Sequence, residues 1–151
     1  MFTNLLVPLD GSDLAEAALP AALELAQKFD SQINLIMIVA HLPHEPLADE
    51  EKAHDQMLDH LRHHQFEEAT KIMETYESNL KKQHSKVNSQ VVEGGAIDKA
   101  ILSTADELGT DAIVMSTHGR GGVSRLLFGS VAEKVIRQAN IPVVLIRGKT
   151  L

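Results

Sequence analysis

Glycines gather in one segment of the chain, Met115–Ser130 (MSTHGRGGVSRLLFGS), which follows an apolar run and precedes a helical pattern. Glycine lets the backbone take positive φ angles and approach a ligand closely. Gly129 and Ser130 stand where the helical pattern begins, and free amides at the start of a helix attract anions. The Ser130 hydroxyl can donate one more hydrogen bond. The segment predicts a phosphate-binding loop, although glycine-rich loops between a strand and a helix also occur without a ligand.

A second polar feature, the turn Asp10-Gly11-Ser12, ends the first apolar run. An aspartate at such a place can accept hydrogen bonds from a ribose hydroxyl or an adenine amine. It can equally well shape a turn or cap a helix. From the residues alone, both interpretations of Asp10 stay open.

Strand-like and helix-like segments alternate along the chain. Five short runs read as strands: Asn4–Leu9, Ile33–Val39, Val87–Val92, Asp111–Met115 and Pro142–Arg147. Most of them are continuously apolar, which is typical of parallel strands covered on both faces. Four segments with helical periodicity lie between them, marked by residues 14–29, 58–80, 97–108 and 131–139. The pattern predicts an α/β fold, a parallel sheet with helices on both faces.

Two helix signals are specific. Pro20 interrupts the first helical pattern and is expected to kink it, because proline removes a backbone donor. Gly109 is expected to end the third helix. Ligands of such sheets bind beyond the carboxyl ends of the strands, where the strand order reverses. That rule places Leu9–Ser12, Val39–Leu42 and Met115–Gly122 at the mouth of any site.

Composition limits the classes of function. With 151 residues, the chain is expected to form a single domain, residues 1–151. It has no cysteine, which excludes disulfides and zinc–thiolate sites, and its net charge of −7 argues against nucleic acid as a partner. We find no run of roughly 18 apolar residues and no signal-peptide pattern at the start. We therefore expect a cytoplasmic protein that does not enter membranes.

The chain resembles the universal stress protein family from end to end. The start, Leu6-Val-Pro-Leu-Asp-Gly-Ser12, is similar to that family's first strand and turn. The segment from Ser116 through Gly129-Ser-Val-Ala-Glu-Lys-Val135 to Pro142-Val-Val-Leu-Ile146 is similar to its last third. The ATP-binding branch carries the motif G-x2-G-x9-G-[S/T], and Gly119, Gly129 and Ser130 match it. The motif's first glycine is Ser116 here, and serine cannot take positive φ as cheaply.

The resemblance implies a fold and a ligand. The fold is an open five-stranded parallel sheet in the order 3-2-1-4-5, and the ligand is ATP with Mg²⁺ bound through the nucleotide. It also implies a site map: Pro8 and Asp10 beside adenine and ribose, Val39 at the adenine edge, Met115 and Ser116 under the ribose, and Gly119, Arg120, Gly129, Ser130 and Val131 near the phosphates. His118, inside the loop, either contacts phosphate or shapes the loop.

Motifs of other nucleotide proteins are absent. The sequence has neither the Walker-type motif G-x4-G-K-[S/T] nor the kinase motifs H-R-D and D-F-G. It also lacks the dinucleotide-binding motif G-x-G-x-x-G after the first strand. No general base is evident, so we expect no catalytic residues and at most a slow ATPase. The leading interpretation is an ATP-binding stress-response or signalling protein. The alternatives are an interaction module that has lost nucleotide binding, which Ser116 would mark, and a slow ATP-hydrolysing enzyme.

Partners follow from the last strand and from the resemblance. An apolar edge strand, Pro142–Arg147, invites pairing with a second copy, and the resemblance also implies a homodimer through it. A protein partner of unknown identity would read the ATP-bound form. His60 and His64 have the i, i+4 spacing that can hold a metal, but a polar helix face explains them more simply, so no metal site is predicted.

Overall fold

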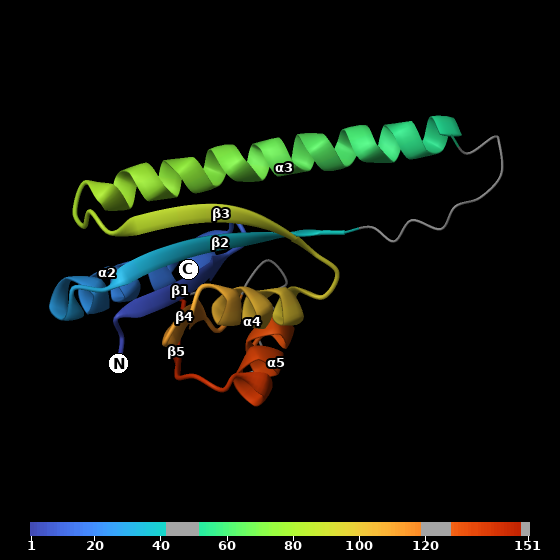
Figure 1. Ribbon diagram of the computed structural model, residues 1–151. Coiled ribbons are helices and arrows are strands. Elements are labelled where there is room, and N and C mark those ends of the chain that lie inside the picture. The colour runs from blue at the N-terminus through green and yellow to red at the C-terminus, as the bar shows by residue number, and fades with distance from the viewer. Residues whose placement is uncertain (42–51, 119–127, 149–151) are drawn as a thin grey trace.

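The computed structural model describes residues 1–41, 52–118 and 128–148 (Figure 1). The strands are β1 (Asn4–Leu9), β2 (Gln32–Ala40), β3 (Val87–Gly94), β4 (Ala112–Ser116) and β5 (Val143–Ile146). The helices are α1 (Asp13–Glu16), α2 (Ala18–Phe29), α3 (Lys52–Lys81), α4 (Ile97–Glu107) and α5 (Ser130–Gln138). All five predicted strands are present, with bounds that differ by no more than two residues at either end.

The strands form one parallel sheet in the order β3-β2-β1-β4-β5, as predicted. β1 lies in the middle, with β2 on one side and β4 on the other. Leu5 and Leu6 of β1 are opposite Ala112 and Ile113 of β4, while Pro8 and Leu9 are opposite Ile36 and Met37 of β2. All carboxyl ends of the strands therefore lie at one edge of the sheet.

Helices cover both faces of the sheet, which explains why the strands are apolar without alternation. Leu5, Val7 and Leu9 of β1 pack on the side of α2 and α3, in a core that includes Ala22 and Met73. Leu6 points to the other face, into a second core with side chains of α4 and α5. Figure 1 shows α3 running along β3, with α4 and α5 across the sheet from it.

Pro20 does not kink a single long helix. The helical segment is instead divided at Ala17 into α1 and α2, and Pro20 is the third residue of α2. The first amides of a helix have no carbonyl partner within the helix, so proline costs no hydrogen bond there. At the end of α4, Gly109 has φ +59°, which agrees with the predicted end of that helix.

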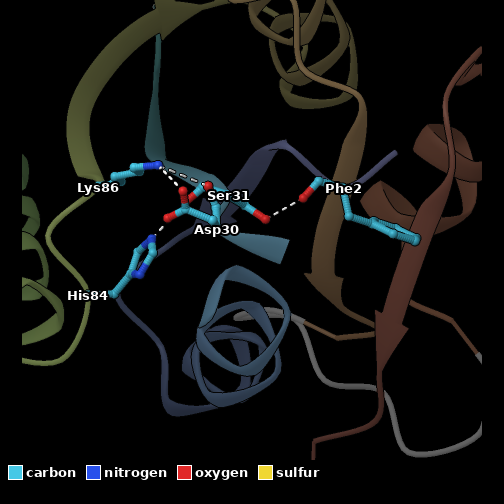
Figure 2. A network of polar contacts seen from close by, with 5 residues as sticks. All are labelled: Phe2, Asp30, Ser31, His84 and Lys86. Carbon is cyan, nitrogen blue, oxygen red and sulfur yellow. Dashed lines mark hydrogen bonds and ion pairs between the residues drawn. The ribbon is translucent and has the colours of Figure 1, made fainter. Parts of the chain in front are cut away.

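A polar network ties the chain together at the amino ends of the strands (Figure 2). Asp30 ends α2 with φ 55°, and Lys86 Nζ lies 2.5 Å from its Oδ2. Buried Ser31 donates its hydroxyl hydrogen to the Phe2 carbonyl, and His84 Nε2 lies 2.7 Å from the Ser31 carbonyl oxygen. The Lys86 hydrogen bond and charge hold the pKa of Asp30 below its usual value. This network fixes the edge of the sheet opposite the expected site.

α3 is the longest helix, with 30 residues, and it is predominantly polar. Within the described parts of the chain, neither α3 nor any other helix combines the length and apolarity needed to cross a membrane.

Candidate functional site

The strand order of the sheet reverses between β1 and β4. The chain builds β1, β2 and β3 toward one side and then crosses over to place β4 on the other side of β1. The helices that follow β1 and β4 leave on opposite faces of the sheet, and ligands of such folds bind beyond the carboxyl ends of the two strands where this happens. The β1–β4 offset places Leu9 level with Ser116. Asp10 and Thr117 thus begin the two segments that flank this position.

The turn after β1 is organised by Asp10. Its Oδ1 accepts hydrogen bonds from the Ser12 amide at 2.9 Å and from the Ser12 hydroxyl at 2.5 Å. Gly11 has φ 80°, a conformation that glycine takes without strain. The Ser12 hydroxyl in turn accepts a hydrogen bond from Ala15 at 3.2 Å and caps α1. Asp10 therefore does shape the turn, and it does so at the mouth of the expected site.

Met115 and Ser116 end β4 and are buried. Ser116 Oγ accepts a hydrogen bond from the His118 amide at 3.4 Å. Among the described residues, the non-glycine positions with positive φ are Phe2 and Asp30, so Ser116 does not have this conformation. A serine therefore costs no backbone strain at this position of the motif.

Gly129 caps α5 from a backbone position where a side chain would be crowded. Its amide donates to the Thr117 carbonyl at 2.6 Å, which binds the start of α5 to the end of β4. A Cβ at Gly129 would lie 3.0 Å from that carbonyl oxygen and 3.5 Å from His118 Cα. Because Thr117 uses the Gly129 amide, the amides left for an anion are those of the next positions, Ser130 and Val131.

The structure brings some of the remaining predicted residues to the same edge. Pro8 lies half-buried near the end of β1, and half-buried Val39 lies near the end of β2. Ser130 is exposed and Val131 half-buried in the first turn of α5. Gly119 and Arg120, like the loop around His41–Glu50 from residue 42 on, lie outside the described residues. Eight of the predicted positions thus lie at the carboxyl ends of β1, β2 and β4 and at the start of α5.

His118 has a structural contact of its own. Its Nδ1 lies 2.9 Å from the Thr117 hydroxyl, and its ring is half-buried at the end of β4. This contact agrees with the loop-shaping alternative for His118. The role of Thr117 could not be predicted from the sequence. Buried Thr117 holds Gly129 through its backbone carbonyl, and every residue type has such a carbonyl.

Tyr76 is the second residue that the sequence did not single out. It donates its hydroxyl hydrogen to Glu16 Oε1, the carboxylate at the end of α1. Burial is the largest cause that raises the pKa of Tyr76, followed by the hydrogen bond to Glu16 and the negative charges of Glu16, Asp10 and Asp13. Tyr76 therefore remains a protonated donor behind the Asp10 turn.

Other candidate sites have weaker support. Within residues 1–41, 52–118 and 128–148, no three His, Asp or Glu side chains are grouped so that they could hold a metal ion. His63 and His64 lie against Glu67 and Glu68 one turn further along α3, at 3.2 and 3.6 Å. A hollow of about 410 Å³ lies between α3 and β3, lined in part by Met73, Glu77 and Ser89. It is away from the carboxyl ends of β1 and β4, and within it Ser89 donates a hydrogen bond to Glu77.

Comparison with known proteins agrees with this architecture. Residues 1–147 match the universal stress protein family. A universal stress protein of Methanocaldococcus jannaschii is 29% identical over 147 residues, which cover 97% of this chain and 83% of that protein. The structure of UspA from Lactobacillus plantarum superimposes with a TM-score of 0.84 at 24% identity and covers 97% of this chain and 98% of that one.

A third relative was solved with a ligand. The universal stress protein from Archaeoglobus fulgidus in complex with dAMP is 25% identical, with a TM-score of 0.64, over 95% of this chain and 97% of that one. The fold is thus that of an α/β protein with a parallel sheet whose strand order reverses between β1 and β4. The chain belongs to the universal stress protein family.

Proposed function

We propose that this protein binds ATP, with Mg²⁺ carried by the nucleotide, in the crevice between the carboxyl ends of β1 and β4. The observation that carries the proposal is the hydrogen bond between Gly129 and Thr117, which holds the amino end of α5 beside the carboxyl end of β4. The positive end of a helix and its free amides favour phosphate. Ribose and adenine would be held by the Asp10 turn at the end of the neighbouring strand β1.

Three further observations support the proposal. The motif residues Gly129 and Ser130 stand at the beginning of α5, as a phosphate site requires. Ser116 occupies the first motif position in ordinary strand conformation, so its replacement of glycine adds no strain. A relative of known structure is described in complex with dAMP, a ligand of the same chemical class.

The experiment begins with the protein as purified. It is denatured, released nucleotides are identified by chromatography, and the stripped protein is titrated with ATP and Mg²⁺ by calorimetry. We expect released or titratable ATP. The Gly129→Val variant should lose roughly 10-fold or more in affinity, because its side chain would push against the Thr117 carbonyl and move the helix amides. The His60→Ala variant, changed on the exposed side of α3, should bind like the wild type.

Three other outcomes have distinct meanings. If neither the wild type nor any variant binds ATP, the protein is an interaction module with an empty crevice. If ATP binds and inorganic phosphate or AMP is released faster than from the Gly129→Val variant, the protein is a slow ATP-hydrolysing enzyme. Equal binding by Gly129→Val and the wild type would mean that the nucleotide binds elsewhere.

The biological role proposed is that of a cytoplasmic stress-response or signalling protein that acts without catalysis. ATP would order the crevice, and a protein partner would read the ordered surface. The functional unit proposed is a homodimer paired through β5. Among the described residues, β5 pairs only with β4, and all four of its residues are half-buried, which leaves one edge of the strand for a second copy.

A further inference from the structure

A chain of hydrogen bonds leads from the long helix α3 to the turn at the end of β1. Tyr76, in the last third of α3, donates to Glu16, which is the last residue of α1. α1 begins at Ser12, whose hydroxyl accepts a hydrogen bond from Ala15 and donates one to Asp10. The four residues of α1 thus connect the Tyr76 contact at Glu16 to the Asp10 turn. The path joins residues that are 60 or more positions apart in the sequence.

α1 is too short to hold its own position. It has four residues, whereas isolated helices below roughly 12 residues are marginal even with favourable sequences. Its support comes from the Ser12 cap at one end and from Tyr76 at the other, together with buried Ala15. The Glu16 amide also donates to the Ser12 carbonyl at 3.1 Å. Loss of the Tyr76 contact would therefore alter the position of Glu16, and this change would be transmitted through Ser12 to the Asp10 turn.

We propose that Tyr76 is a positioning residue of the nucleotide site, which holds α1 and the Asp10 turn in place and couples occupancy of the crevice to α3. The inference rests on the proposed function, because it concerns the same site. Tyr76 does not itself touch the crevice: it acts through Glu16 and Ser12. A ligand that orders the Asp10 turn strengthens the Tyr76–Glu16 contact, and by linkage that contact strengthens binding of the ligand.

Tyrosine fluorescence can report on this coupling. Tyr76 is the only tyrosine, and the chain has no tryptophan, so tyrosine emission and absorbance report on this residue alone. Tyrosine emission is quenched when its hydroxyl bonds to a carboxylate. We expect Mg²⁺–ATP to change the emission saturably, with the midpoint that calorimetry gives. The Glu16→Gln variant should emit more strongly and should ionise its tyrosine at lower pH than the wild type.

Affinity is the second measurement. Removal of one hydrogen bond by Tyr76→Phe or by Glu16→Ala should weaken ATP binding roughly 5-fold, and the double variant should be no weaker than either single one. The control is Glu74→Gln, which removes an exposed carboxylate from the same helix and should leave affinity and emission unchanged. Unfolding of each variant by urea separates lost binding from lost stability.

The outcomes separate this inference from the proposed function. If calorimetry detects no ATP binding to the wild type, both are overturned. If ATP binds but tyrosine emission does not change, or if Tyr76→Phe binds ATP as the wild type does, the nucleotide site stands and the coupling through Tyr76 is wrong. Additive losses in the double variant would also overturn it, because the two residues would then act separately.

Discussion

At the end of β3, Gly94 leaves no space for a side chain. A Cβ there would lie 2.7 Å from the Cβ of Ala100 in α4 and 3.4 Å from Ile38 Cγ2 in β2. Because the Ala100 methyl has no rotamer with which to move away, Gly94→Ala should destabilise the protein by about 1–3 kcal/mol, as overpacking does. The neighbouring residue is the matched control. Gly95 has no atom within 4 Å of a Cβ, so Gly95→Ala should cost nothing measurable. Urea unfolding measures both, and equal stability of the two variants would contradict the expected contact.

Asp111, just before β4, holds the amino end of the chain. Its carboxylate accepts hydrogen bonds from the Thr3 amide at 2.9 Å, from the Thr3 hydroxyl at 2.7 Å and from the Asn4 amide at 3.1 Å. Burial alone would raise the pKa of Asp111, but these hydrogen bonds together outweigh it and hold the pKa below the ordinary 3.8. The carboxylate therefore stabilises the fold fully above pH ~4, and this stabilisation is lost as the pH falls through the lower pKa of the folded state.

The corresponding variant is Asp111→Asn. At pH 7 we expect its free energy of unfolding to be lower by about 1–2 kcal/mol, because an amide group turns a donor toward the Thr3 and Asn4 donors. The difference from the wild type should shrink as the pH falls below ~4, where the wild-type carboxylate takes up its proton. Asp106→Asn, on the exposed surface of α4, should change stability by no more than about 0.5 kcal/mol. A difference that stays constant down to acid pH would show that the charge plays no part.

At the scale of elements, the division between α1 and α2 changes what Pro20 does. As the third residue of α2, it replaces an amide that no carbonyl of that helix could bind. If Pro20 strained a continuous helix, its removal would stabilise the protein by several kcal/mol. We expect instead that Pro20→Ala brings no gain, or a loss of about 0.4–1 kcal/mol from the greater freedom of the unfolded chain. Thermal unfolding of the two proteins decides between these outcomes.

Local signals in the sequence predicted most elements. Continuous apolar runs predicted most of the five strands, because strands buried on both faces have no polar alternation. Gly109 marked the end of α4, since glycine readily adopts the φ of +59° found there. The break at Ala17 escaped prediction because alanine favours helix, and only the packing of α1 and α2 on the sheet divides the segment. Periodicity alone likewise did not reveal that α3 begins as early as Lys52.

At the scale of the whole molecule, the sheet order 3-2-1-4-5 came with the family resemblance, and the order brings Asp10 and Ser116 to the same edge. Contacts between distant side chains could not be predicted in this way. Tyr76 and Glu16 are 60 residues apart, and neither has a neighbour in the sequence that indicates the pair. The Thr117–Gly129 hydrogen bond uses backbone atoms, so no residue type marks it. Sequence patterns predicted where the ligand site would lie, and the structure shows the contacts that hold the segments around that position.

The last prediction concerns the free edge of β5 and its pairing with a second copy. Carbonyls of Pro142 and Ile146 accept hydrogen bonds from β4, at 2.9 Å each. Since alternate residues of a parallel strand bond to the same neighbour, the backbone of Leu145 is directed away from β4. Leu145→Pro should therefore remove an outward amide, leave the β4 ladder intact and give a monomer in sedimentation experiments. Leu145→Ala loses the same packing but keeps its amide, so it should remain a dimer like the wild type. A monomeric wild type at micromolar concentration, or a dimeric Leu145→Pro variant that is folded by circular dichroism, would exclude pairing through β5.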